Sequence, residues 1–291
     1  MDATFHPRRR QAQRLFSPAS SILRFMRRTL VLALFATVAS VHAHPEIDEA
    51  LARLNPLIAA EPANAALYLE RGELYARHED GVGAEANYLR AAELNPDFPG
   101  LARARGALAL ASGHAADALP HLDRAIAANA ADAEALLLRG RARGALRQNA
   151  AALADFNAAL HHLASPTPEF FLARAAVCAN AADAVASLDE GIARLGSVVT
   201  LELRALALEE QLGRVDAAVA RLDRLAAQSE RRETWLKRRG DVLARAGRAG
   251  AARAAYTAAV AAIAELPRWL QQSPDTTRLL AELRRLTASN S

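Results

Sequence analysis

The chain has 291 residues, of which 52% are hydrophobic, 5% aromatic and 23% charged, and its formal net charge is +4. Alanine is abundant and β-branched residues are sparse, which favours closely packed helices over sheets. Residues 1–43 contain seven arginines and one acid, a net charge of +6, which leaves −2 for the remainder. The body of the chain therefore lacks the basic surface that nucleic acid or an anionic membrane requires. The expected class is all-α.

The first predicted element is a signal peptide within residues 1–43. Arg27 and Arg28 precede the apolar run 29–41, and small residues occupy the positions before His44. About 13 apolar residues are too few for a bilayer, which needs roughly 20, whereas they suit a cleavable leader. We therefore expect cleavage after Ala43, a periplasmic or secreted mature protein, and no stable membrane span after cleavage.

Three alternatives remain for this leader. An uncleaved anchor or a buried amphipathic helix is the first. In the second, residues 1–25 are an extension before a true start at Met26, because a complete signal peptide begins there. Arg27 and Arg28 also match part of a twin-arginine signal, so both general and twin-arginine secretion stay open.

Residues 44–64 are predicted to form an N-terminal capping helix. A helix near 47–60 carries Ala50 and Leu54 where the second helix of a repeat would carry them, and Pro62 follows as its closing proline. Pro56 is expected to kink this helix. The segment reads as half a repeat that covers an otherwise exposed apolar end.

A period of 34 residues dominates the chain from residue 65 to residue 266. Small residues and one bulky column share this period, as follows: Gly72, Gly106 and Gly140; Ala84, Ala118 and Ala152; Tyr88, Leu122 and Phe156; Ala91, Ala125 and Ala159. Small residues allow two helices to approach closely, and the bulky column fills the space between them. A fixed period of this length indicates stacked helical repeats.

These columns resemble the tetratricopeptide repeat family, whose unit is a pair of antiparallel helices. Residues 65–98 match best, through Tyr68, Gly72, Tyr75, Ala84, Tyr88, Ala91 and Pro96. The resemblance implies a right-handed superhelical α-solenoid of about six helix-turn-helix repeats with capping helices at both ends. The repeats are expected near 65–98, 99–132, 133–165, 166–197, 198–231 and 232–266.

The later repeats depart from the pattern. The fourth and fifth are degenerate, and in the fourth only nine residues separate Ala175 from Ala184, where twelve separate Gly106 from Ala118. We expect the turn between the two helices of the fourth repeat to be shortened. The sixth repeat returns to form through Gly240, Ala252, Tyr256 and Ala259.

Residues 267–291 are predicted to be a C-terminal capping helix and tail. Ser273 and Pro274 form a helix start, with a side-chain cap and a proline in the first turn. The following helix places four leucines on one face: Leu279, Leu280, Leu283 and Leu286.

The sequence offers little chemistry, so we expect no enzyme, no catalytic residue and no cofactor. Cys178 is the only cysteine and is interpreted as a packing residue. His161 and His162 fall at a helix end, and His114 and His121 are assigned structural or solvent-exposed roles. Mature His44 is the exception, because an N-terminal amine and imidazole can chelate copper. A copper-handling accessory protein is therefore the alternative function.

The favoured function follows from the resemblance. In the family, the first helices line a groove that binds a peptide or partner helix. The corresponding residues here are Leu69, Glu73, Arg77, Arg103, Leu110, Leu137, Arg141, Lys237, Asp241 and Arg245. They lack the lysine and asparagine set with which chaperone-binding members hold a C-terminal carboxylate. We therefore expect a non-catalytic scaffold or adaptor in the bacterial cell envelope, with a protein or peptide partner and no nucleic acid.

Periodic arginines before the small residue complete the sequence observations. They are Arg71, Arg105, Arg139 and Arg239. We interpret them as residues whose aliphatic stems pack while their guanidinium groups reach the surface. Such a ladder, a row of arginines one repeat apart, could also bind an acidic partner.

Overall fold

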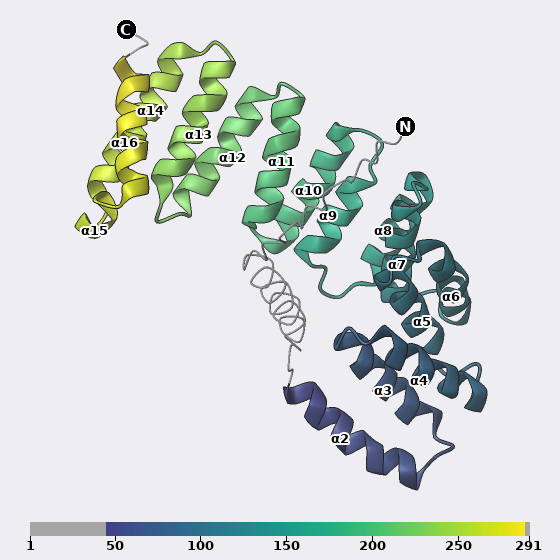
Figure 1. Ribbon diagram of the computed structural model, residues 1–291. Coiled ribbons are helices and arrows are strands. Elements are labelled where there is room, and N and C mark those ends of the chain that lie inside the picture. The colour runs from purple at the N-terminus through teal and green to yellow at the C-terminus, as the bar shows by residue number, and fades with distance from the viewer. Residues whose placement is uncertain (1–44, 289–291) are drawn as a thin grey trace, which may run out of the picture. The chain divides into compact units, whose positions relative to one another are not determined.

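The computed structural model describes residues 45–288, and these residues form helices joined by short turns, with no strand among them (Figure 1). The chain divides into two compact units, residues 1–52 and 53–291. The helices are α2 (Pro45–Ala60), α3 (Ala65–Arg77), α4 (Gly81–Leu94), α5 (Leu101–Ala111), α6 (Ala115–Ala128), α7 (Ala133–Ala145), α8 (Asn149–His162), α9 (Pro168–Ala176), α10 (Ala181–Leu195), α11 (Val199–Gln211), α12 (Val215–Ala227), α13 (Arg232–Arg245), α14 (Ala249–Glu265), α15 (Arg268–Gln271) and α16 (Pro274–Ala288).

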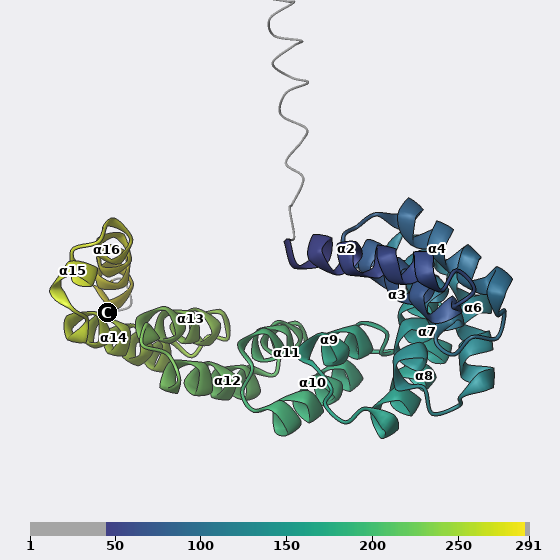
Figure 2. The same cartoon turned by 90° about the horizontal axis from the view of Figure 1, so that it is seen from below.

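The twelve helices from α3 to α14 form six antiparallel pairs, and each helix packs against the next along the chain. First helices of successive pairs also pack together, α3 on α5, α5 on α7 and α9 on α11. Figure 2 shows the first helices α9, α11 and α13 on one side, and the second helices α10 and α12 on the other. This arrangement confirms an all-α solenoid of six helix-turn-helix repeats.

The small and bulky columns of the repeat lie in the interior of the pairs. Each of these residues is buried: Gly72, Ala84, Tyr88, Ala91, Gly106, Ala118, Ala125, Gly140, Ala152, Phe156, Ala159, Gly240, Ala252, Tyr256 and Ala259. A Cβ atom on Gly106 would lie 2.6 Å from Cγ of Leu122. The bulky side chain of the second helix thus occupies the space that the missing side chain leaves.

A left-handed residue reverses the chain inside five of the six pairs. Gly113, Gly213 and Gly247 have φ angles of 79°, 68° and 74°. Glu79 and Arg147 hold the same place with φ angles of 59° and 61°, although their side chains disfavour this conformation. These five residues follow the last turn of the first helix, so they fix the tight return into the second helix.

The fourth pair departs from the others in its first helix. The turn of residues 177–180 has four residues, whereas three residues join the helices of each other pair. Helix α9 has nine residues, and the first helices of the other pairs have 11 to 14. The prediction of a shortened turn is therefore wrong. The helix is shortened instead, at its C-terminal end. Ala175 follows the start of α9 by seven residues, as Gly72 follows the start of α3, but α9 ends at Ala176 whereas α3 continues to Arg77.

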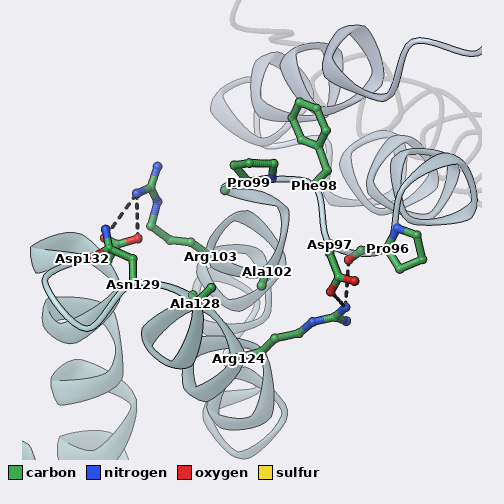
Figure 3. Close-up of a pocket in the computed structure, with 12 residues that line it drawn as sticks. Pro96, Asp97, Phe98, Pro99, Ala102, Arg103, Arg124, Ala128, Asn129 and Asp132 are labelled. Carbon is green, nitrogen blue, oxygen red and sulfur yellow. Dashed lines mark hydrogen bonds and ion pairs between the residues drawn. The ribbon is translucent and has the colours of Figure 1, made fainter.

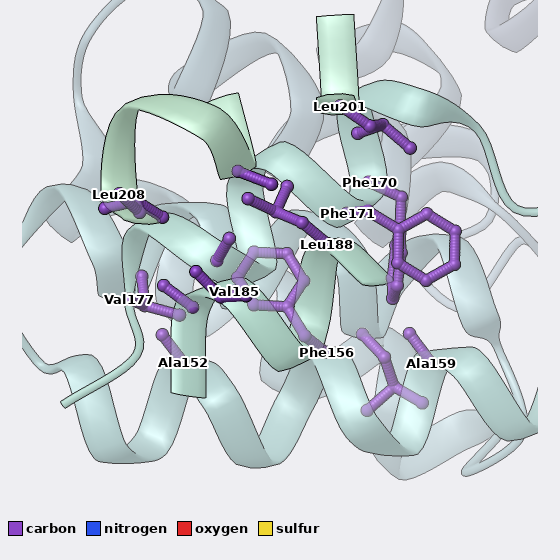
Figure 4. Close-up of a cluster of buried hydrophobic side chains, with 14 residues drawn as sticks. Ala152, Phe156, Ala159, Phe170, Phe171, Val177, Val185, Leu188, Leu201 and Leu208 are labelled. Atoms are coloured by element: carbon purple, nitrogen blue, oxygen red, sulfur yellow. The ribbon is translucent and has the colours of Figure 1, made fainter. Parts of the chain in front are cut away.

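An aromatic cluster compensates for this short helix (Figure 4). Phe170 and Phe171 of α9 are almost completely buried, and Phe156 of α8 meets Phe170 edge to face, with ring centroids 5.8 Å apart. Leu188 of α10 and Leu201 of α11 belong to the same cluster. Large rings bury more apolar surface for each residue, which stabilises a pair that has fewer residues.

The two ends carry single helices. Helix α2 runs through Pro56 without interruption, and its residues Leu54 and Ile58 are buried. At the other end, the Ser273 hydroxyl accepts a hydrogen bond from the Thr276 amide at 3.3 Å, so the predicted helix cap is present. Leu283 of α16 is fully buried in a cluster that includes Tyr256 and Leu243.

Candidate partner-binding groove

The residues predicted to line a groove lie on four first helices. Helix α3 carries Leu69, Glu73 and Arg77; α5 carries Arg103 and Leu110; α7 carries Leu137 and Arg141; α13 carries Lys237, Asp241 and Arg245. Glu73, Arg77, Arg141 and Arg245 are exposed, and all the others except Leu69 are half-buried. Leu69 is buried, so it contributes to packing and is not open to a partner.

The structure brings three of these residues together around one cavity. Glu73, Arg77 and Arg103 line a hollow of about 430 Å³ between α3 and α5, which we call the groove cavity. Its remaining lining residues are Ala76, Tyr88, Ala104, Ala107, Leu108, Ala111 and Glu134. The walls are thus mainly apolar, and the charged groups belong to a few side chains.

The electrostatics of this cavity are mixed. Burial, followed by the nearby carboxylates of Glu73 and Glu85, raises the pKa of Tyr88 to about 12. Arg103 is held by two acids, with Nη1 3.0 Å from Oδ2 of Asp132 and Nε 3.3 Å from Oε2 of Glu134. Because these acids lie at the start of α7, Arg103 links the second helix pair to the third.

A second hollow lies beside Arg103 and was not predicted from the sequence (Figure 3). This loop cavity has a volume of about 530 Å³ and lies between the loop 96–100, the helices α5 and α6, and the turn before α7. Arg124 bridges its edge, donating to Oδ1 of Asp97 at 2.5 Å and to the Pro96 carbonyl at 3.0 Å. Its two arginines are therefore already paired.

Two groove residues of the sixth pair, Lys237 and Asp241, form polar contacts with side chains of neighbouring helices. Nζ of Lys237 lies 3.0 Å from Oδ2 of Asp241 and 3.0 Å from Oε1 of Glu282, which belongs to α16. Burial alone would lower the pKa of Lys237, but the hydrogen bonds to Glu282 and Asp241 outweigh it and the pKa is raised. The Tyr256 hydroxyl also donates to Oδ1 of Asp241 at 3.1 Å. The C-terminal helix, which packs on α14, thus supplies an acidic partner for Lys237 of the predicted groove.

Arg245, the last groove residue, joins the fifth pair to the sixth. Its Nη2 lies 2.9 Å from Oε2 of Glu210 in α11. Both side chains border a smaller hollow of about 260 Å³, which is lined by Gly213, Val215, Ala218, Val242 and Ala246.

The periodic arginines act inside the solenoid. Nη1 of Arg139 lies 2.7 Å from Oδ1 of Asp123 on α6, and its Nη2 lies 2.7 Å from Oδ1 of Asp155 on α8. The other three use the second helices in the same way: Arg71 with Asn55 and Asn87, Arg105 with Glu85, and Arg239 with Asp223. Their guanidinium groups are therefore engaged by the chain itself, and the idea of a free ladder for an acidic partner is wrong.

The fifth pair contains a buried charge network that the sequence did not predict. Arg221 of α12, 3% exposed, contacts three acids, Asp189, Glu202 and Glu209, at 2.7 to 2.9 Å. Arg224 adds a second pair with Glu202, at 3.0 Å. The only signal in the sequence is the number of acidic residues on α11, which carries Glu202, Glu209 and Glu210.

The remaining candidate residues are scattered. Cys178 is half-buried, and its burial raises the pKa of the thiol. His161 and His162 are exposed at the end of α8, and burial lowers the pKa of His121. Within residues 45–288, no three His, Cys, Asp or Glu side chains gather in a way that could hold a metal ion. His44 and the leader lie outside the described residues.

Within the same part of the chain, no helix is long and apolar enough to cross a membrane.

The family model described as tetratricopeptide repeat matches residues 45–99 and 203–267. No curated protein sequence matches the chain.

Several solved structures resemble the fold. PilW, described as a widely conserved type IV pilus biogenesis factor, is 20% identical, with a TM-score of 0.55 over 73% of this chain and 94% of its own. PilF from Pseudomonas aeruginosa is 17% identical, with a TM-score of 0.51 over 76% and 98%. A tetratricopeptide repeat protein from Parabacteroides merdae is 17% identical, with a TM-score of 0.50 over 77% and 98%. These similarities establish the fold.

Proposed function

Because this chain is a tetratricopeptide repeat protein, we propose that it is a non-catalytic protein-interaction scaffold of the bacterial cell envelope, binding a peptide or partner helix along its first helices. The observation that carries the proposal is the groove cavity. It opens on the first helices α3 and α5, its walls are mainly apolar, and exposed Glu73 and Arg77 border it. Partner sites in proteins combine an apolar interior with a polar rim in this way.

Two features favour the groove over the outer face of the second helices. The periodic arginines that reach the second helices are engaged by Asp, Glu and Asn side chains of the chain itself. Arg77 and Arg141, in contrast, are exposed and form no ion pair within residues 45–288. Charged groups without an internal partner are available to steer and orient a binding protein.

The location in the cell envelope rests on the leader of the sequence. The apolar run 29–41 after two arginines and the small residues before His44 have the composition of a cleavable signal peptide. The mass of the intact protein recovered from a periplasmic extract tests this point. A mature chain that begins at His44 is the expected product. Retention of residues 1–43 in the cytoplasm would contradict the proposed location.

Partner binding is tested by affinity capture with a matched pair of variants. Arg77→Ala removes an exposed guanidinium from the groove, and Arg214→Ala removes one from the turn before α12, where it also forms no ion pair within the described residues. We expect wild type and Arg214→Ala to retain one recurrent envelope protein that Arg77→Ala loses. Equal capture by all three proteins would place the interaction elsewhere and contradict the proposal.

A further inference from the structure

The edge of the groove cavity carries an acidic and a basic side chain that form no ion pair within the described residues. Glu73 and Arg77 lie four residues apart on α3, and both are exposed. No ion pair or side-chain hydrogen bond is formed by either one within residues 45–288, whereas Arg103 opposite is held by Asp132 and Glu134. The edge therefore offers one carboxylate and one guanidinium, separated by one helical turn of about 6 Å.

The sixth pair repeats this acid and base in the same register. Asp241 and Arg245 follow Gly240 by one and five residues, as Glu73 and Arg77 follow Gly72. In the sixth pair both charges are used, since Asp241 binds Lys237 and the Tyr256 hydroxyl, and Arg245 binds Glu210. In the first pair both are free, and an apolar cavity adjoins them.

Helix α16, which packs on α14 at the end of the solenoid, shows how this chain holds an amphipathic helix. It is amphipathic, with Leu283 fully buried and Leu279, Leu280 and Leu286 half-buried on one side. Glu282, beside the buried leucine, binds Lys237 of the groove at 3.0 Å. The chain thus holds its own helix through two contacts: a buried leucine packs against the core, and the adjacent glutamate pairs with a charged residue of the predicted groove.

We propose that the groove cavity binds an amphipathic partner helix that inserts aliphatic side chains between α3 and α5. The partner carries a basic residue for Glu73 and an acidic residue for Arg77, one turn apart. Ala76, Ala104, Ala107, Leu108 and Ala111 provide the apolar wall. Their short side chains leave the 430 Å³ that the partner's leucine-sized groups fill. This inference rests on the proposed function and specifies the partner that the groove recognises.

The experiment uses a phage-displayed library of helix-forming peptides, selected on the purified full chain. The expected ligands have leucine, isoleucine or methionine at positions i and i+3 or i+4, flanked by one basic and one acidic residue a turn apart. Ala107→Phe, which fills the cavity, should weaken the best peptide by at least about tenfold. Ala86→Phe, at an exposed position of α4, is the matched control and should leave the affinity unchanged.

A charge exchange tests the orientation. Glu73→Arg should weaken the peptide by about tenfold, and replacing the peptide's basic residue by glutamate should restore the affinity. Circular dichroism and thermal unfolding establish that each variant is folded. Failure of the exchanged peptide to recover, selection of extended proline-rich sequences, or failure to select any sequence would overturn the inference.

The failure of this inference is distinguishable from that of the proposed function. If the selected peptides ignore Ala107→Phe but lose affinity with Arg141→Glu, the groove binds partners at another place and only the inference fails. If neither substitution affects any peptide and affinity capture is also unchanged, both fail.

Discussion

Arg221 of α12 donates hydrogen bonds to both carboxylate oxygens of Glu209 in α11, at 2.7 and 2.9 Å, inside the fifth helix pair. Its third nitrogen donates to Oε2 of Glu202 at 2.9 Å. Arg221, Glu202 and Glu209 are each at most 3% exposed. Such a group of buried charges is stable only as a whole, because each charge has lost its water and depends on the others.

Removal of the arginine should therefore be costly. Arg221→Met keeps most of the side-chain volume but leaves Glu202 and Glu209 without their shared partner. We expect a loss of about 3 to 5 kcal/mol in the free energy of unfolding, seen as a lower urea midpoint. Arg90→Met, which breaks an exposed pair with Glu93, should leave the urea midpoint almost unchanged, because water screens an exposed ion pair. Equal effects of the two substitutions would refute the importance of burial.

The same network should respond to acid. Burial alone would raise the pKa of Glu202, but hydrogen bonds from Arg224 and Arg221 outweigh it and lower the pKa below its ordinary value of 4.5. A carboxyl whose pKa is lowered by folding stabilises the fold above pH 4.5, and this stabilisation is lost as the pH falls through the folded value. The stability difference between wild type and Glu202→Gln should thus be largest near pH 7 and shrink below pH 4.5.

The two left-handed residues with side chains provide a test of the repeat turns. A residue other than glycine in this conformation costs about 1 kcal/mol. Glu79→Gly and Arg147→Gly should therefore each stabilise the protein by up to about 1 kcal/mol, measured as a higher urea midpoint. Gly113→Ala, at the equivalent turn, should have the opposite effect although nothing lies within 4 Å of its new methyl group. A destabilised Glu79→Gly would indicate that its side chain matters more than the backbone.

The repeat pattern is visible in the sequence because it records a packing requirement. Gly106 meets Leu122 and Gly140 meets Phe156 in the same way, so each pair needs a small residue and a bulky one at a fixed separation. Within a pair the two residues are 16 positions apart, and this arrangement recurs every 34 residues, so the sequence predicts the pairs before any contact is known. The cap at Ser273 is equally local, since the donor, the Thr276 amide, lies only three positions after the acceptor.

Other features depend on how helices are placed in space. Arg221 finds its acids 12, 19 and 32 residues away, and no local pattern specifies which arginine will be buried. The contact of Lys237 with Glu282 likewise requires the position of α16 relative to α13. Family resemblance assigns Leu69 to the lining of the groove but contains no information on how closely the neighbouring side chains pack over it.

The close approach of paired helices gives the last prediction, a comparison of two Gly→Ala substitutions in helices. A Cβ atom on Gly106 would lie 2.6 Å from Cγ and 2.7 Å from Cδ2 of Leu122, and Leu122 is fully buried and cannot move aside freely. We expect Gly106→Ala to destabilise the protein by about 1 to 3 kcal/mol, because the helices of the second pair must separate.

Gly250 has nothing within 4 Å of its virtual Cβ atom and lies in the first turn of α14. Alanine there restricts the unfolded chain and favours the helix, so Gly250→Ala should stabilise the protein by about 0.5 kcal/mol. Urea unfolding of both variants measures the two effects, which should have opposite signs. If both substitutions stabilise, the helices of the second pair tolerate a methyl group between them, and close packing at Gly106 is not what the 34-residue period preserves.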